Sequence, residues 1–464
     1  MSQVDLKMRP TPSIASSLSL PIWSSFAGAQ TLWWPSSRST PPRVVLLFIP
    51  GNPGVPSYYI DFLHSIYTSP LLKSSGIEIV AVSHRGHAPL PKVGSNAVWG
   101  DNKTNQSQAS KGYGCTLRDQ VRHKVAVVDA INRMYNAEGR QTKVILVGHS
   151  IGAWIASEVL KARPEVGVDG LQLLFPTMEW IGRTPNARKI NALVLNRITR
   201  NVVLPLPLLL FSLLPLWLVV WLVRLITGQP APASLATAEL LTTKGAVYNA
   251  LNMAQEEFAT VQKLEQSTVD TISSFTSDET GGRVRSYWAS EDSDGWAPTW
   301  IRTQVESSLH LHRVHLPPGL GLTDKTPSRP GTATARGSKT HMRTRSFSVS
   351  EYRSSPGSVP DLRNAKAIRK PNGEIVIEAV VQESSSDSED EPPKSALTGG
   401  GEREQGNGTG TSTSARGLQY HYGRSRATST HCRIGIPHAF CLKHSEDMAK
   451  IVAHWISYDH LSEE

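Results

Sequence analysis

The stretch VILVGHSIGAW, from Val144 to Trp154, restricts the fold of this chain more than any other feature. It begins as an apolar run of strand length, continues through Gly148, Ser150 and Gly152, and ends as the start of a helix. A serine nucleophile at such a turn needs small flanking residues, because larger side chains would collide at the strained backbone. We therefore predict a nucleophile at Ser150; the alternative is an ordinary strand-to-helix turn that contains a serine.

Strand and helix patterns alternate on both sides of this stretch, from Val44 to about Thr177. The expected strands are Val44–Ile49, Ile77–Ser83, Lys143–Val147, Leu171–Phe175 and, further on, Val284–Trp288. The expected helices are Pro56–Tyr67, Thr116–Tyr135, Ala153–Ala162 and, near the end, Glu446–Tyr458. This order predicts an α/β fold, with a mainly parallel sheet and helices on both faces.

The turn-rich segment IPGNPG, Ile49–Gly54, follows the strand that would supply a second oxyanion donor in this architecture. Its glycines allow the backbone to approach a substrate carbonyl closely. We expect the backbone N–H groups of Asn52 and Ile151 to form the oxyanion hole. The alternative is an ordinary turn between a strand and a helix.

A serine nucleophile needs a histidine that takes its proton and an acid that orients the histidine. In this architecture the acid follows the serine along the chain, and the histidine follows the acid. The loop SEDSDGW, after the last expected strand, offers three acids: Glu291, Asp292 and Asp294. The segment IGIPHAF places His438 in a loop before the final helix, so His438 is the candidate base. We interpret His444 as a surface residue or a neighbour of the helix cap at Ser445, and His454 as a structural residue inside the helix. The chemistry requires neither a metal nor a cofactor.

Between Val202 and Val223 the chain has 22 residues without a formal charge, a length that could span a bilayer. Three prolines divide the run, and a single crossing would place Ser150 and His438 on opposite sides. We therefore predict a hairpin with both ends on one side; the alternative is a buried cap helix over the active site. The side chains expected to enter the lipid are Leu206, Leu209, Phe211, Leu214, Trp217 and Trp221.

From Pro317 to Ser429 the sequence is rich in Ser, Thr, Gly, Pro and charge, so we predict disorder with an isolated strand at Glu374–Val381. RTRSFS and ESSSDSEDE are typical of kinase substrates, which makes kinases candidate partners; the alternative is solvated charge. Much of the net charge of +9 comes from seven Lys and Arg between Thr323 and Arg353. Since zinc-finger spacing, an RRM signature and interleaved aromatics are missing from the sequence, we expect no nucleic-acid binding.

These patterns divide the chain into successive parts. The predicted organisation is an N-terminal segment (1–42), a first part of the core (43–200), an apolar hairpin (201–228), a cap region with the acid loop of the core (229–316), a disordered insertion (317–429), and a last part of the core with the histidine loop and final helix (430–464).

Several motifs, taken in order, resemble those of the lipid droplet-associated serine hydrolase family. They are IPGNPG, SHRGH, GHSIGA, LFPT followed by TPNA, DGW and PHAF, and the likeness runs from about Val44 to Leu461 apart from the insertion. The resemblance implies an α/β-hydrolase fold with Ser150 as nucleophile, His438 as base and Asp294 as acid. It also implies residence at lipid droplets and the endoplasmic reticulum membrane. The long insertion between acid and base departs from the family pattern.

Residues and resemblance together predict a lipid droplet-associated enzyme that cleaves carboxylic esters of lipids, such as sterol esters or acylglycerols. Its partners would be a droplet or reticulum surface, on which it lies without crossing, and a neutral lipid ester. The alternative is an inactive scaffold that uses the same fold at the droplet surface.

Overall fold

The computed structural model describes residues 21–37, 41–90, 114–137, 139, 142–165, 167–290, 293–317, 320, 343–348, 366–369, 375–381 and 425–462. The chain forms two compact units. One contains Met1–Arg329 together with Arg424–Glu464, and the other contains Pro330–Gly423.

In the described part of the first unit, nine strands form one sheet in the order β1-β2-β4-β3-β5-β6-β7-β12-β8. Strands β1 and β2 are antiparallel to their neighbours, and the strands from β4 onward are parallel. The strands are β1 (Ile22–Phe26), β2 (Ala29–Trp34), β3 (Val44–Ile49), β4 (Ile77–Val82), β5 (Lys143–His149), β6 (Gly170–Leu174), β7 (Arg283–Trp288), β8 (His312–Val314) and β12 (Ala427–His431).

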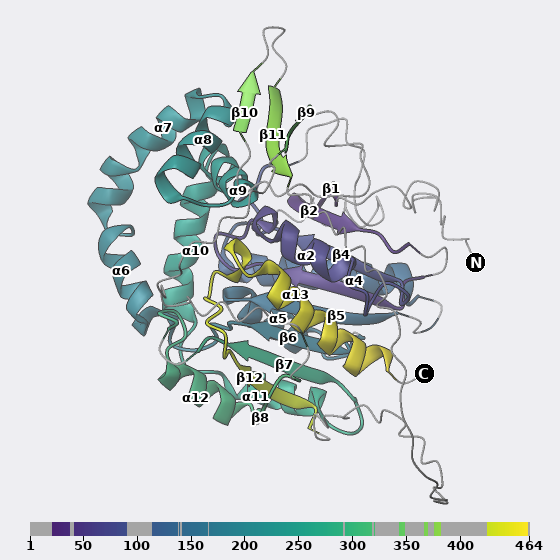
Figure 1. Cartoon of the computed structure of the whole chain (residues 1–464). Coiled ribbons are helices and arrows are strands. Elements are labelled where there is room, and N and C mark those ends of the chain that lie inside the picture. Colours follow the sequence, from purple (N-terminus) through teal and green to yellow (C-terminus); the bar gives the residue numbers. More distant parts are fainter. Residues whose placement is uncertain are drawn as a thin grey trace, which may run out of the picture. The chain divides into compact units, whose positions relative to one another are not determined.

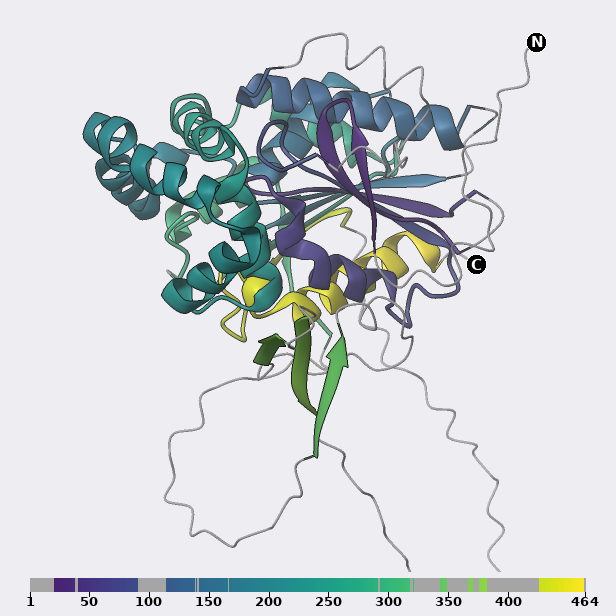
Figure 2. The ribbon, with the colours of Figure 1, turned by 90° about the horizontal axis from the view of Figure 1, so that it is seen from above.

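Helices cover both faces of this sheet, as the alternating pattern predicts. Along β3, Val45 and Leu47 face one core, while Leu46 and Phe48 face the other. Figure 2 shows α4 on one side of the sheet, with α2 and α13 on the other. The described helices that pack on the sheet are α2 (Ile60–Tyr67), α4 (Leu117–Tyr135), α5 (Ile151–Ala162), α11 (Gln266–Phe275), α12 (Thr299–Ser308) and α13 (Ser445–Ile456). The α/β-hydrolase fold is therefore confirmed.

Between β6 and β7 the chain leaves the sheet and builds a cap from five helices. These lie beyond the carboxyl ends of the parallel strands, where α6, α7, α8 and α10 are seen on the left of Figure 1. The cap helices are α6 (Pro185–Leu193), α7 (Pro205–Leu213), α8 (Leu216–Thr227), α9 (Ala231–Thr242) and α10 (Ala246–Thr260).

The apolar run forms two short helices, α7 and α8, with a break at Leu214 and Pro215. Pro205 and Pro207 lie in the first turn of α7, where a missing N–H removes no intrahelical bond, so Pro215 marks the break. Among the described helices, none alone has the length and hydropathy to cross a bilayer. Helices α8 and α9 meet those criteria as a pair, with a bend of 117° between them.

Two boundaries of the predicted organisation are wrong. Strands β1 and β2 lie within residues 1–42, so the core begins before residue 43. Strand β12 begins at Ala427, so the core also resumes before residue 430. The sequence of β12, ATSTH, lacks a long apolar side chain and resembles the low-complexity segment that precedes it. It is nevertheless buried, because β7 and β8 flank it.

The second unit contains a three-stranded antiparallel sheet in the order β10-β11-β9. Its strands are β9 (Arg343–Ser348), β10 (Lys366–Arg369) and β11 (Ile375–Val381). The strand expected at Glu374–Val381 is thus present as β11, but it is paired and not isolated. The segment RTRSFS coincides with β9, whereas ESSSDSEDE and most of the predicted disordered insertion lie outside the described residues.

Candidate active site

Ser150 occupies the turn between β5 and α5 in a strained backbone conformation, with φ of 55° and ψ of −125°. Positive φ is uncommon for a residue with a side chain, and it lifts the serine out of the turn. A Cβ atom at Gly148 would overlap the backbone of Gly152 and Ala153, and one at Gly152 would overlap the Ile49 carbonyl oxygen. The two glycines are therefore required by the close approach of α5 to β5 and β3.

The glycine-rich loop after β3 lies directly against this serine. A Cβ atom placed on Gly51 would be 2.8 Å from the Ser150 Cβ atom, so the loop backbone contacts the candidate nucleophile. Among the described residues, no hydrogen-bond acceptor faces the backbone N–H of Asn52. Ile151 is the first residue of α5, where backbone N–H groups have no partner within the helix. Both amides are thus suited to bind an oxyanion.

Asp294 and His438 lie 144 residues apart in the chain, yet they form a hydrogen bond. His438 Nδ1 donates to Asp294 Oδ2 over 2.8 Å. Their loops meet because β7 and β12 are parallel neighbours, with Trp288 opposite His431 at the ends of the two strands. The long insertion precedes β12 and leaves this pairing intact. Asp292 lies outside the described residues.

Burial raises the pKa of Asp294. The charge of His438, together with hydrogen bonds from His438 and from the backbone of Trp296 and Ala297, lowers that pKa by more than burial raises it. The net pKa is below the ordinary value, and the carboxylate stays ionised at neutral pH. An ionised carboxylate accepts and does not donate, so the proton lies on Nδ1 of His438 and its Nε2 is left to accept a proton. No hydrogen bond joins Ser150 to His438 among the described side chains, and such contacts often tighten on substrate binding.

His149 links the serine turn to the His438 loop and was not identified from the sequence. Its Nε2 donates to the His438 carbonyl oxygen over 2.9 Å, and its ring centre lies 5.1 Å from that of His438. Burial first, and then the charge of His438, lower the pKa of His149 to about 3, so the ring is neutral. Its Nδ1 therefore accepts from the Tyr59 hydroxyl at 2.8 Å. The position of His149 next to Ser150 was the available signal.

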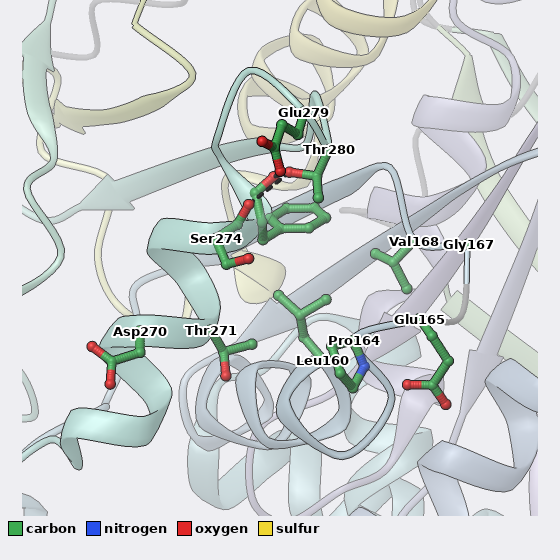
Figure 3. A pocket seen from close by; sticks show the side chains of 11 residues that line it. Leu160, Pro164, Glu165, Gly167, Val168, Asp270, Thr271, Ser274, Glu279 and Thr280 are labelled. Carbon is green, nitrogen blue, oxygen red and sulfur yellow. Dashed lines mark hydrogen bonds between the residues drawn. The ribbon is translucent and has the colours of Figure 1, made fainter.

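A cavity of about 530 Å³ lies elsewhere in the fold, between the end of α5 and α11 (Figure 3). Its residues Gly167 and Val168 precede β6, and Thr280 precedes β7, so it lies at the amino ends of the parallel strands. None of the predicted catalytic residues lines it. Because ligands of such sheets bind at the carboxyl ends of the strands, this cavity is separate from the candidate active site.

The sheet, the cap between β6 and β7 and the strained serine turn define the class of protein: the chain is an α/β-hydrolase. A profile described as lipid-droplet associated hydrolase matches residues 42–319. The chain therefore belongs to the lipid-droplet associated hydrolase family, as its motifs indicate. The matched region includes Ser150 and Asp294, while His438 lies beyond it.

Individual relatives match shorter regions. The lipid droplet-associated hydrolase of Homo sapiens is 32% identical over 147 residues, covering 32% of this chain and 42% of the relative. That of Gallus gallus is 29% identical over 231 residues, covering 49% and 66%. The chain thus spans less than half the length of the human relative. Among solved structures, a putative lipase from Acinetobacter baumannii aligns with 66% of this chain and 86% of its own, at 12% identity and a TM-score of 0.38.

The acid assignment leads to a prediction about two neighbouring aspartates. In Asp294→Asn the amide no longer holds the proton on Nδ1 of His438, so kcat should fall by about 10²–10⁴-fold with little change in KM. Asp292→Asn, two residues earlier in the same loop, is the matched control and should keep full activity. Steady-state kinetics with a water-soluble ester measure both. If Asp294→Asn kept full activity and Asp292→Asn lost it, the triad acid would be Asp292 and not Asp294.

Proposed function

We propose that the chain hydrolyses carboxylic esters of lipids at a droplet or endoplasmic reticulum surface, with Ser150, His438 and Asp294 as a catalytic triad. The observation that carries the proposal is the hydrogen bond between His438 and Asp294 beside the strained serine turn. A serine on a strained turn and a hydrogen-bonded His–Asp pair at the carboxyl edge of one sheet are the elements from which a serine triad is built, and their presence supports the proposal.

In the proposed mechanism, the Ser150 hydroxyl attacks the ester carbonyl carbon while His438 Nε2 removes its proton. The backbone amides of Asn52 and Ile151 stabilise the oxyanion of the tetrahedral intermediate. His438 then protonates the leaving alcohol, and an acyl-enzyme on Ser150 remains. Water, deprotonated by His438, attacks the acyl carbon, and His438 returns the proton to the Ser150 oxygen as the fatty acid leaves. Asp294 stabilises the charged imidazole in both halves of the reaction.

The exposed apolar side chains of α7 and α8 support the lipid surface as the place of action. Four of the six predicted lipid-binding side chains are exposed to solvent: Leu206, Leu209, Trp217 and Trp221. The other two, Phe211 and Leu214, are partly buried against a small cluster that includes Val219, Val223 and Ala238. One side of the hairpin thus packs on the neighbouring cap helix α9, and the other presents its apolar side chains outward.

A panel of emulsified lipid esters tests the substrate class. We expect Ser150-dependent release of fatty acid from sterol esters or acylglycerols on droplets, at a rate well above that from the same esters with the Ser150→Ala variant. Release from neither lipid class by droplet-bound protein would reject lipid ester hydrolysis. That result, combined with intact droplet binding, would favour a scaffold that uses the same fold.

A further inference from the structure

The candidate oxyanion loop is held from two directions. On one side the turn SHRGH supports it: His87 Nδ1 donates to the Pro53 carbonyl oxygen at 2.8 Å, and the His84 backbone N–H donates to the Gly54 carbonyl oxygen at 2.9 Å. On the other side the cap helix α10 holds the side chain of Asn52. The loop residue that carries the candidate oxyanion donor is therefore fixed by the cap.

The contacts between Asn52 and α10 use both hydrogens of one amide group. Its Nδ2 donates to the Ala250 carbonyl oxygen at 3.0 Å and to Glu257 Oε1 at 2.9 Å. Glu257 is buried, with 5% of its surface exposed. A buried carboxyl group is costly unless it is hydrogen-bonded, and the hydrogen-bond donor to Glu257 lies in the candidate active site.

Helix α10 is well placed to transmit this constraint, because it contacts two parts of the core besides Asn52. Asn249 Nδ2 donates at 2.9 Å to the carbonyl oxygen of Gly86, which belongs to the SHRGH turn that supports the loop. Glu256 Oε2 accepts from the backbone N–H of Leu117, at the start of α4, at 2.6 Å. The helix that carries Glu257 is thus anchored both to the SHRGH turn and to the start of α4.

We propose that Glu257 is a positioning residue, which holds Asn52 so that the backbone N–H of Asn52 faces the oxyanion formed at Ser150. This assignment rests on the proposed function and adds a role that the triad does not include. A displacement of about 1 Å at a reacting centre can cost about 10²-fold in rate, so a side chain that fixes the loop has a large effect on kcat.

The charge state of Glu257 agrees with this role. Burial raises the pKa of Glu257, the hydrogen bond from Asn52 lowers it, and the charge of Glu256 raises it again. The net pKa is about 8. At neutral pH the side chain is therefore mostly uncharged. An uncharged acceptor holds the Asn52 amide without adding a negative charge beside the site where the oxyanion forms.

The test compares Glu257→Leu, Glu257→Gln and Asn52→Ala in the full chain, with kcat and KM measured on a water-soluble ester. Leucine removes the acceptor, and we expect kcat to fall about 10- to 100-fold with KM changed less than about threefold. Glutamine keeps an acceptor oxygen and should restore kcat to within about threefold of wild type. Gln255→Leu also introduces leucine, but at an exposed position of α10, where the side chain contacts Arg200 and not Asn52, and it serves as the matched control.

A double-mutant cycle completes the experiment. Because Glu257 acts through Asn52, the Asn52→Ala/Glu257→Leu double variant should be no slower than the slower single variant. Additive losses, or wild-type kcat in Glu257→Leu, would overturn the assignment. If Glu257→Leu fails to fold, Asn52→Ala decides, and an unchanged kcat rejects the role. Failure of the proposed function gives a different result: turnover would persist in Ser150→Ala. In that case the role of Glu257 would be rejected together with the triad.

Discussion

The Ser150→Ala variant is expected to lose about 10⁴–10⁶-fold in kcat on a water-soluble ester, with a far smaller change in KM. Alanine removes the attacking hydroxyl but fits the same strained turn, whose shape depends on Gly148 and Gly152. The loss is therefore chemical and should leave thermal unfolding close to that of wild type. Steady-state kinetics beside a melting curve measure the two effects separately.

The His438→Ala variant should lose a similar factor, and the Ser150→Ala/His438→Ala double variant should be no slower than either single variant. This lack of additivity is expected because nucleophile and base act as one unit. His444→Ala is the matched control: His444 also lies near an aspartate, with its Nδ1 3.3 Å from Asp447, but it is outside the proposed triad. If His444→Ala lost activity and His438→Ala kept it, the general base would be His444.

The Trp217→Glu/Trp221→Glu variant is expected to bind droplets at least about 100-fold more weakly than wild type. The two indole side chains are 62% and 55% exposed on α8. Burying each in lipid contributes roughly 1.5–3 kcal/mol, and every 1.4 kcal/mol is about tenfold in binding. Flotation with phospholipid-coated artificial droplets measures the partition, and hydrolysis of a water-soluble ester confirms that the site is intact.

Trp300→Glu provides the control for this surface, because Trp300 is 47% exposed on α12, outside the cap. It should bind droplets as wild type does. Equal loss of binding in both variants would mean that charge alone weakens attachment. Full binding of Trp217→Glu/Trp221→Glu would reject α8 as a lipid-binding element. Deletion of residues 204–223 is a coarser version of the same test and should release the protein into the soluble fraction.

The strands of the central sheet were predictable because they are buried on both faces. VVLLFI at Val44–Ile49 is an unbroken apolar run, and such a run of this length has few alternatives in a soluble fold. The serine turn was predictable for a different reason: its glycines are required by contacts with neighbouring backbone, so they leave a mark in the sequence. In both cases the residues that determine the local structure are adjacent in the sequence, so the sequence pattern is enough to predict it.

The outer strands of the sheet were missed because their burial depends on partners that are far away in the chain. Strand β12 is short and polar, and its buried face exists because β7 and β8 lie beside it. Strands β1 and β2 pair as a hairpin and join the sheet through β4. The hydrophobic pattern of β12, or of β1 and β2, does not by itself predict a buried strand.

The side chains that support the candidate site are predictable to different degrees. Asp294 and His438 each stand in a loop that follows a strand, and strand order brings those loops together. Glu257 has no such signal, because it lies in an ordinary amphipathic helix and its role appears when α10 is placed against Asn52. His149 also depends on tertiary contact, since its partner is a backbone carbonyl of the distant His438 loop.

The role of Ser150 as nucleophile is tested by mapping the residue that a fluorophosphonate probe modifies. We expect one adduct per chain on the Ser150 hydroxyl, measured by intact mass and peptide mapping, with no adduct in Ser150→Ala and much slower labelling in His438→Ala. An adduct on another residue, or a folded, droplet-bound protein that the probe leaves unmodified, would contradict this role.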